Sequence, residues 1–193
     1  MLDQKLKNKK ILLASKSPRR RELLASLGID FEIVIIKSDE AYPSELKREK
    51  ITEYIAVEKS DVYGKLNPDE ILITADTIVW FNDQKIGKPK DKNDAFEMLS
   101  ELSGNTHEVF TSVCVRTDSK KICFSETTEV DFDFASDEEI LYYIENFNPL
   151  DKAGSYGIQD WFGFTKVLGI RGDYYNVMGL PVRKLYQVLN LEF

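Results

Sequence analysis

The sequence has little of several residue types on which common enzyme classes depend. Its 193 residues include one histidine, His107, and two cysteines, Cys114 and Cys123. A Ser-His-Asp triad or a zinc site needs partners that a chain with a single histidine lacks, which argues against serine hydrolases and zinc enzymes. The two cysteines could in principle pair with each other, but the N-terminus shows no signal-peptide pattern. We therefore expect both cysteines to be reduced core thiols of a cytoplasmic protein.

Long apolar runs and an excess of positive charge are also missing. The longest aliphatic stretches, such as Ile33–Ile36, are far shorter than the roughly 20 apolar residues of a membrane span, so no membrane partner is expected. A net charge of -7 argues against a nucleic-acid partner, because that binding depends on neutralising phosphates. The charge is uneven, however: residues 1–21 carry eight Lys or Arg and one acid, whereas residues 125–145 carry eight acids and no Lys or Arg. This asymmetry leaves room for a local anion site near the N-terminus.

The order of the predicted elements indicates an α/β fold with a mixed sheet, in a single domain over residues 1–193. With 42% hydrophobic residues, the chain is long enough to bury a core. Apolar and β-branched runs predict strands at residues 11–14, 31–36, 71–81, 106–117 and 121–134. Apolar spacing and capping residues predict helices at residues 18–28, 48–65, 91–103, 136–145 and 179–189. On the helix at 48–65 an apolar stripe is formed by Ile51, Ile55, Val62 and Leu66, and Ser136 with Glu139 forms a capping box at the start of the helix at 136–145.

The first segment that can carry chemistry lies where the first predicted strand meets a helix. Here Ser15 and Ser17 are followed by Pro18, Arg19 and Arg20. Proline at the first helical position leaves the free amides of that turn pointing outward, and the helix dipole adds partial positive charge. Two arginines add donors that suit phosphate oxygens. The segment can be a triphosphate cradle or, equally, an ordinary capped helix with a solvated basic face.

Other phosphate-binding motifs are absent. Neither Gly64-Lys65 nor Gly87-Lys88 is followed by Ser or Thr, as a Walker loop requires, and no dinucleotide fingerprint is present. Kinases and Rossmann oxidoreductases are therefore disfavoured.

Two acidic positions are candidates for a base and a metal site. Asp76 lies inside the apolar strand Ile71–Trp80, where a carboxylate must be hydrogen-bonded, paired or bound to metal. Asp39 and Glu40 follow a strand on a predicted loop, and a carboxylate from this pair could hold Mg²⁺ together with Asp76, because Mg²⁺ takes one or two carboxylates plus substrate phosphates. The alternatives are an aspartate satisfied by backbone amides and a solvated acidic turn.

Three further polar residues have a functional and a structural interpretation. Lys59 on a helix and Lys88 after a hairpin would usually be surface lysines. The glycine-spaced loop Asp151–Gln159 ends in an amide that could pair with a base edge, or it is simply a structural turn. The aromatic residues that we expect in the core rather than under a base are Trp161, Phe162, Tyr174 and Tyr175.

Taken together, these segments resemble the Maf family of nucleotide pyrophosphatases from Ile11 to Leu189. The matching segments, in family order, are Leu13–Arg20 with Glu22–Leu24, Ala75–Val79, Gly87–Pro89, Leu102–His107 with Val109 and Thr111, Asp151–Gln159, and Tyr175–Pro181. The resemblance implies hydrolysis of a nucleoside triphosphate to monophosphate and pyrophosphate with a divalent cation, Mg²⁺ or Mn²⁺. It also implies an elongated mixed sheet flanked by helices, with two lobes around a cleft, as in inosine-triphosphate pyrophosphatases.

The same resemblance implies roles for individual residues. Asp76 corresponds to the base that activates water and, with Glu40, to a metal ligand. The substrate-binding residues that it implies are Ser15, Ser17, Arg19, Arg20, Lys59, Lys88 and Gln159.

Substrate and assembly are less narrowly indicated. The ending Gly157-Ile158-Gln159 resembles the subgroup that acts on dTTP and UTP, with modified pyrimidine nucleotides left open. Asn146–Pro149 and Ser155 depart from the family pattern beside the expected base pocket. Two alternatives stay open: a house-cleaning pyrophosphatase for deaminated or other non-pyrimidine nucleotides, and a non-enzymatic nucleotide-binding regulator of cell division. A homodimer is also left open.

Overall fold

The structure is a computed structural model that describes residues 2–193, and it divides into two compact units. The first unit comprises the chain up to Asp76 together with Thr111–Glu126 and Gly179–Phe193. The second comprises Thr77–Phe110 and Thr127–Met178. Because the unit boundaries fall within or beside three long strands, each of these strands contributes residues to both units. The single domain predicted for residues 1–193 stays a prediction.

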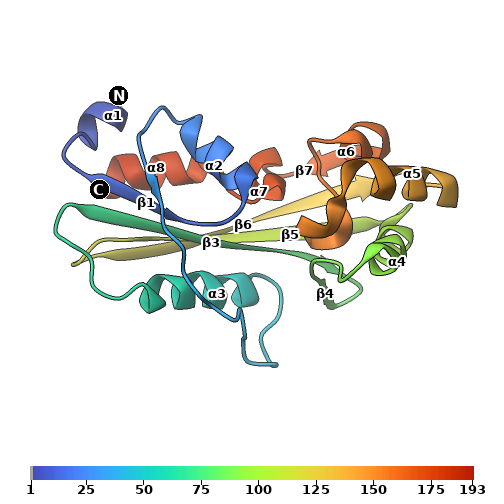
Figure 1. Ribbon diagram of the computed structural model, residues 1–193, viewed down its shortest axis with the longest axis horizontal. Coiled ribbons are helices and arrows are strands. Elements are labelled where there is room, and N and C mark those ends of the chain that lie inside the picture. The colour runs from blue at the N-terminus through green and yellow to red at the C-terminus, as the bar shows by residue number, and fades with distance from the viewer. Residues whose placement is uncertain (1) are drawn as a thin grey trace. The chain divides into compact units, whose positions relative to one another are not determined.

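A seven-stranded mixed sheet confirms the predicted fold class (Figure 1). The strand order is β2-β1-β3-β5-β6-β7, with β4 paired to β3. β1 is parallel to β2 and β3, whereas the pairs β3–β4 and β6–β7 are antiparallel. The strands are β1 (Lys10–Ala14), β2 (Glu32–Ile33), β3 (Glu70–Phe81), β4 (Gln84–Ile86), β5 (Thr106–Arg116), β6 (Lys121–Phe132) and β7 (Val167–Arg171).

Eight α-helices flank the sheet within the described residues, together with two short 3₁₀ turns. The helices are α1 (Leu2–Lys5), α2 (Pro18–Ala25), α3 (Glu49–Val62), α4 (Lys92–Leu102), α5 (Asp137–Phe147), α6 (Trp161–Lys166), α7 (Tyr174–Met178) and α8 (Val182–Glu192). The 3₁₀ turns are η1 (Pro149–Asp151) and η2 (Ala153–Ser155). None of these helices has the length and apolar character needed to cross a membrane.

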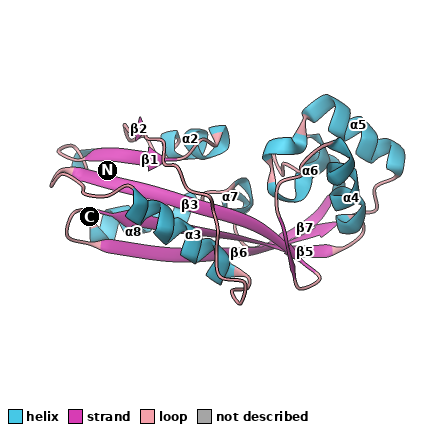
Figure 2. Cartoon of the chain, turned by 60° about the horizontal axis from the view of Figure 1, so that its bottom comes forward, coloured by secondary structure: helices cyan, strands magenta, loops and turns pink. Residues whose placement is uncertain are grey.

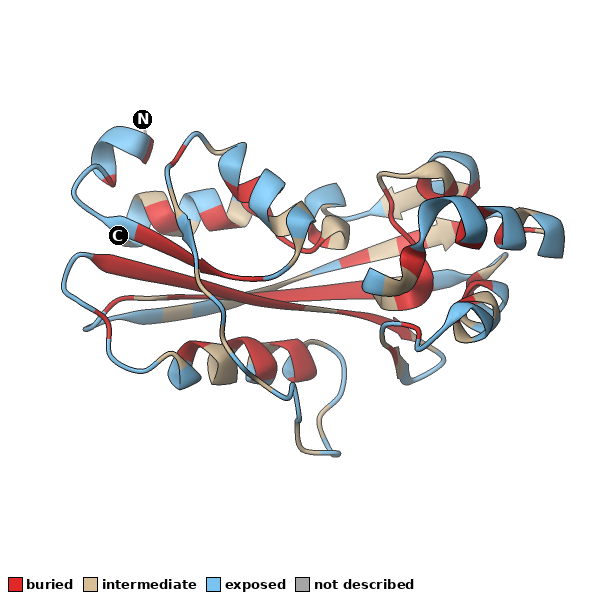
Figure 3. Ribbon diagram, in the orientation of Figure 1, coloured by how far each residue is buried: buried red, intermediate tan, exposed pale blue. Residues whose placement is uncertain are grey.

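The core of the first unit forms around β1 and β3. Figure 1 shows α3 on one side of this part of the sheet and α2 and α8 on the other. β3 is buried over most of its length, as Figure 3 shows, because helices cover both of its faces. From α3, Ile51, Ile55 and Ala56 are buried against it, as the predicted apolar stripe requires. Val62 does not belong to that stripe, because it ends the helix and is 51% exposed.

The predicted helix starts are confirmed where capping residues were recognised. Pro18 occupies the first position of α2, and the Ser17 hydroxyl accepts a bond from the Arg20 amide. At α5, Ser136 and Glu139 form a reciprocal capping box. These side chains satisfy amides that a helix start leaves without intrahelical partners.

Two predicted elements have different bounds from those expected. The strand predicted at 31–36 is only two residues long, since after the Val34 amide bonds the Leu13 carbonyl the chain leaves the edge of the sheet. Ile35 is consequently 71% exposed. The last helix begins after Pro181 rather than at Gly179, because proline has no amide to donate within a helix.

The second unit contains an aromatic core beneath three helices. Figure 2 shows α4, α5 and α6 gathered together. Tyr143 and Phe162 are fully buried, and the prediction that Phe162 lies in the core is confirmed. For Tyr174 and Tyr175 the same prediction was wrong: they are 36% and 46% exposed, because α7 is a single short helix that buries Asn176 instead.

The two cysteines are not free thiols. Cys114 and Cys123 are joined by a disulfide, with their Cα atoms 4.1 Å apart. The hairpin turn closed by the Thr117 amide and the Lys120 carbonyl places them opposite each other on β5 and β6. Cys123 is also exposed rather than buried. The expectation of two reduced core thiols was therefore wrong, since sequence spacing alone did not reveal their cross-strand pairing.

His107 is buried in the second unit as a neutral side chain. It is 2% exposed, and its Nε2 lies 2.8 Å from the Tyr156 hydroxyl. Its ring packs edge-on against Phe132 and Tyr156. Burial lowers the pKa of His107 from 6.5 to about 4, although the charge of Asp131 opposes the shift. The folded state therefore favours the unprotonated ring.

We expect His107 to make the fold less stable as the pH falls. The unfolded chain takes up the proton near pH 6.5, whereas the folded chain resists it until about pH 4. Stability is therefore lost between these values, by roughly 3 kcal/mol in total. Urea unfolding across this range should show a steeper loss for the wild type than for His107→Gln, which cannot titrate. Parallel pH curves for the two proteins would contradict the prediction.

Candidate functional site

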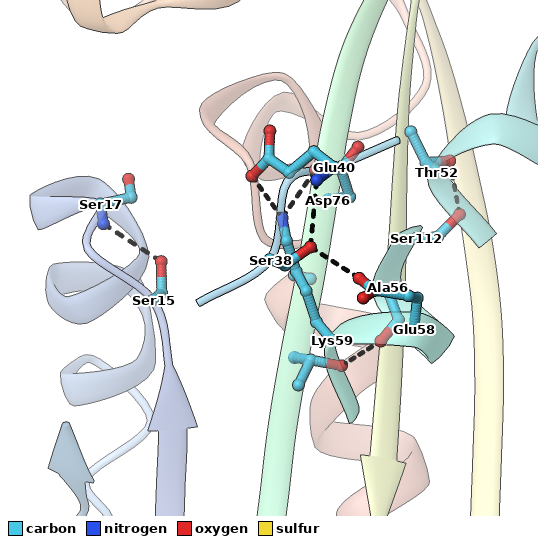
Figure 4. Close-up of polar contacts among 12 residues, drawn as sticks. Ser15, Ser17, Ser38, Glu40, Thr52, Ala56, Glu58, Lys59, Asp76 and Ser112 are labelled. Carbon is cyan, nitrogen blue, oxygen red and sulfur yellow. Dashed lines mark hydrogen bonds and ion pairs between the residues drawn. The ribbon is translucent and has the colours of Figure 1, made fainter. Parts of the chain in front are cut away.

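Asp76 lies in the middle of β3 with almost all of its surface covered. The residue is 7% exposed, and its neighbours along the strand are buried apolar residues or threonines. Its Oδ1 lies 3.0 Å from Nζ of Lys59, an ion pair that Figure 4 shows at the centre of the site. The strand prediction and the expectation that this carboxylate needs a partner are both confirmed. The partner is a lysine rather than backbone amides.

Lys59 forms ion pairs with two carboxylates at once. It lies in the last turns of α3, and its side chain is 12% exposed. Its Nζ is 3.0 Å from Asp76 and 2.8 Å from Oε1 of Glu40, whose side chain is 52% exposed. Because the Lys59–Asp76 pair is shielded from water, its charges interact more strongly than an exposed pair would. Lys59 is therefore not the surface lysine that the sequence alone would suggest.

Three consecutive residues of β3 are tied to three different groups. The Thr74 hydroxyl donates to the Ala56 carbonyl of α3 at 2.6 Å. The Ala75 carbonyl accepts from Nη1 of Arg20 at 2.9 Å, and Asp76 pairs with Lys59. These contacts link α2 and α3 to β3 on either side of the Asp76 carboxylate.

The loop that carries Glu40 is anchored to α3 beside Lys59. The Ser38 hydroxyl donates to Oε2 of Glu58 at 2.6 Å and accepts from the Glu40 amide at 3.1 Å (Figure 4). Glu40 itself has a φ of 56°, a left-handed conformation that is uncommon outside glycine. Sequence reasoning missed Ser38 and Glu58 as parts of this arrangement. No motif marked them, although Glu58 is the chain neighbour of Lys59.

The serine turn lies at the junction of β1 and α2, as predicted. The Ser17 amide donates to the Ser15 hydroxyl at 3.1 Å, and Ser15 is buried. The Ser17 hydroxyl caps the first turn of α2. The turn therefore presents the positive end of the α2 dipole, where an anion is stabilised. Arg19 lies on the same turn and is half-buried.

Arg20 has a structural task that was not predicted. Its Nε donates to the Gly179 carbonyl at 2.7 Å and its Nη1 to the Ala75 carbonyl at 2.9 Å. It thereby joins the start of α2 to the strand residue before Asp76 and to the segment before α8. Burial lowers the pKa of Arg20, while the charge of Asp76 opposes the shift.

In the second unit, Lys88 and the glycine-spaced loop occur side by side. Lys88 is exposed after β4, and the carbonyl of its neighbour Gly87 accepts from the Gly154 amide at 2.9 Å. Gly154 has a φ of +69°, and a Cβ there would lie 2.9 Å from Cγ2 of Val79. Both the positive φ and the close approach favour glycine at position 154, which lets the loop lie against Val79 of β3.

Gln159 occupies a tight turn in that loop. The Asp160 amide donates to the Gly157 carbonyl at 3.2 Å, which closes the turn with Gln159 as its third residue. Its Oε1 is buried, and no group within residues 2–193 bonds to it. Buried acceptors without partners are rare in folded proteins and call for an explanation, such as a bound ligand.

The candidate residues fall into two sets. Asp76, Lys59 and Glu40 are in direct contact in the first unit, and Arg20 binds the residue before Asp76. The other first-unit members are Ser15, Ser17 and Arg19; those of the second unit are Lys88 and Gln159.

The acidic pair fits a cation of the magnesium type. Glu40 and Asp76 already converge on one positive centre, the Lys59 ammonium, and both offer the carboxylate oxygens that Mg²⁺ prefers. The described part of the chain holds no group of three or more His, Cys, Asp or Glu side chains that could bind a metal. Two carboxylates would therefore hold the ion only with further ligands from substrate or water, as is usual for Mg²⁺.

Comparison with known proteins gives consistent matches over the whole length. The family described as Maf-like protein matches residues 10–192. The chain is 50% identical over 190 residues to the dTTP/UTP pyrophosphatase of Flavobacterium johnsoniae, covering 98% of each chain. It is 53% identical to the dTTP/UTP pyrophosphatase of Phocaeicola vulgatus over 188 residues, which are 96% of this chain and 97% of that protein.

We expect Arg20→Ala to destabilise the first unit. The change removes two charge-assisted bonds to backbone carbonyls and should lower the free energy of unfolding by roughly 2 to 3 kcal/mol. Urea denaturation measures the loss. Arg21→Ala, in the same helix, is the matched control and should have a clearly smaller effect, because the Arg21 side chain is exposed. Equal losses in the two variants would show that Arg20 has no special structural task.

Proposed function

The chain belongs to the Maf family, and from this membership we propose that it hydrolyses dTTP and UTP to the nucleoside monophosphate and pyrophosphate. The observation that carries the proposal is the 50% identity, over 98% of each chain, to a relative named dTTP/UTP pyrophosphatase. The enzyme is thus a nucleoside triphosphate pyrophosphatase. The geometry described above supports the roles that we propose below for individual residues.

Asp76 is proposed as the general base. Its side chain is buried beside the Lys59 ammonium, and a carboxylate at this position can act as the acceptor for a proton from water. In the reaction, the water oxygen bonds to the α-phosphorus as the bond from that phosphorus to the bridging oxygen breaks. The water proton passes to Asp76, and pyrophosphate leaves with the bridging oxygen.

Glu40 and Asp76 are proposed to hold the divalent cation, Mg²⁺ or Mn²⁺. When bound, such an ion neutralises phosphate charge. Lys59 supports this assignment because it already brings the two carboxylates to one point. Near the substrate, Lys59 is proposed to donate to a phosphate oxygen.

The serine turn is proposed to bind the triphosphate. Ser15 and Ser17 shape the start of α2, whose dipole and free amides favour phosphate oxygens. Arg19 adds positive charge on the same turn. Arg20 is proposed to combine its structural bonds with a phosphate contact. Lys88 is exposed in the second unit, and its role in substrate binding stays a prediction.

Gln159 is proposed to read the base. Uracil and thymine share a ring N3–H, which can donate to the buried Oε1 that no group within residues 2–193 satisfies. Cytosine has no such donor at neutral pH and would leave the amide oxygen without a partner. A buried polar group without its partner costs about 1 to 3 kcal/mol, enough for a preference of roughly tenfold to a hundredfold.

A nucleotide panel tests the function. The purified protein is incubated with UTP, dTTP, CTP and ITP, each with Mg²⁺ or Mn²⁺, and pyrophosphate and orthophosphate are scored separately. Turnover of UTP and dTTP with release of pyrophosphate supports the proposal. Faster turnover of ITP would favour a house-cleaning enzyme for deaminated purines, and unchanged nucleotide after prolonged incubation would favour a binding regulator.

Asp76→Asn should lower the turnover number for UTP at least about a hundredfold, the usual loss for a positioned general base. Nucleotide binding, measured by calorimetry, should persist because the amide keeps the shape of the side chain. Glu70→Gln is a matched control on the same strand, since Glu70 is also buried but its carboxylate accepts from the Asn67 amide instead of pairing with Lys59. Near-normal turnover by folded Asp76→Asn would remove Asp76 from the mechanism.

Gln159→Ala should reduce base discrimination more than it reduces catalysis. The ratio of kcat/KM for UTP to that for CTP should fall by roughly tenfold or more, because the variant no longer penalises the missing N3–H. The measurement uses both nucleotides at saturating metal. An unchanged ratio, or a wild type that prefers CTP, would remove Gln159 as the base reader.

A further inference from the structure

One buried hydroxyl holds both ends of the turn that carries Gln159. The Tyr143 hydroxyl accepts from the Gly157 amide at 3.0 Å. The same hydroxyl lies 3.0 Å from each carboxylate oxygen of Asp160, to which it donates. Gly157 and Asp160 are the first and last residues of the turn, and Gln159 lies between them. A single side chain from α5 therefore spans this turn.

Tyr143 is itself held rigidly. It is fully buried, and its ring is stacked on Phe147 and Trp161 and tilted against Phe162. Burial and the charge of Asp160 both raise the pKa of the Tyr143 hydroxyl, so it stays protonated and keeps its donor role at neutral pH. Its position cannot drift without disturbing a packed aromatic core.

The backbone of the turn is equally confined. A Cβ at Gly157 would lie 2.3 Å from Oδ2 of Asp160, so only glycine lets that carboxylate reach Tyr143. A Cβ at Gly163 would lie 2.0 Å from the Ile158 carbonyl oxygen, so α6 packs directly onto the turn. Between these contacts, the Oε1 atom of Gln159 is buried and bonds to no group within residues 2–193.

We propose that Tyr143, acting through Gly157 and Asp160, is a positioning residue that sets the orientation of Gln159 and hence the discrimination between pyrimidine bases. The inference rests on the proposed base-reading function of Gln159. The Tyr143 hydroxyl bonds to Gly157 and Asp160, so its effect on Gln159 passes through the turn. A Gln159 amide held in one orientation disfavours cytosine, which cannot donate to its oxygen. An amide that is free to rotate can adopt another orientation and lose this discrimination.

The first experiment compares Tyr143→Phe with the wild type. The variant keeps the ring and its packing but removes the hydroxyl that holds the turn. The ratio of kcat/KM for UTP to that for CTP should fall by roughly threefold to tenfold, mainly through a lower KM for CTP, while kcat for UTP changes little.

Tyr156→Phe is the matched control. Tyr156 is also buried, and its hydroxyl bonds to His107 rather than to the turn. Both variants lose one buried hydroxyl and should lose thermal stability to a similar degree. Only Tyr143→Phe should change the ratio between bases. Equal changes in the ratio would show that Tyr143 acts only through general stability, which overturns the proposal.

A double-mutant cycle decides whether Tyr143 acts through Gln159. In the Gln159→Ala background, Tyr143→Phe should leave the UTP to CTP ratio unchanged, because no amide remains to be oriented. The same fall in both backgrounds would overturn the proposal. If Gln159→Ala lowers the ratio but Tyr143→Phe does not, the base reader stands and the positioning role fails. If Gln159→Ala leaves the ratio unchanged, the assignment of the reader itself fails.

Discussion

The burial of one carboxylate, that of Asp76, is the constraint on which the rest of the first unit's site depends. An ionised side chain inside an apolar strand is stable only when an opposite charge compensates for the lost hydration. Lys59 supplies that charge at 3.0 Å, and it can do so because α3 packs Ile55 and Ala56 against β3. Glu40 then pairs with the same ammonium. The packing of α3 against β3 therefore also brings the three charged side chains together.

Much of the fold follows from local signals in the sequence. The passage from β1 through the serine turn to α2, and the capping box of α5, were predicted because a few adjacent residues decide them. The region around α6, β7 and α7 was not predicted. These elements are five or six residues long, and β7 depends on pairing with β6, a partner distant in sequence. A disulfide between Cys114 and Cys123 was considered but not expected, because the sequence shows no signal peptide and the pairing depends on the cross-strand register of a hairpin.

The candidate site was predictable to different depths. A charged residue inside an otherwise apolar strand is conspicuous in the sequence, so Asp76 could be proposed from physical reasoning alone. Lys59 and Glu40 could not be proposed in this way, because neither a helical pattern nor an acidic loop indicates that Lys59 pairs with both Asp76 and Glu40. Tyr143 is harder still: on α5 it has the spacing of a core aromatic, which it also is. Only the hydrogen bonds of its hydroxyl distinguish it from a phenylalanine.

The crowding at Gly157 and Gly163 bears on how substrate preference can diverge during evolution. Because neither position accepts a side chain without displacing the turn, both would be preserved by selection for a folded protein, whichever nucleotide is used. Their conservation among relatives would thus carry no information about substrate. Position 159 differs, since its side chain can be exchanged within an unchanged backbone frame. Substrate preference, in nature or in a selected library, is therefore expected to diverge by substitution of residue 159 while the glycines that shape its turn are retained.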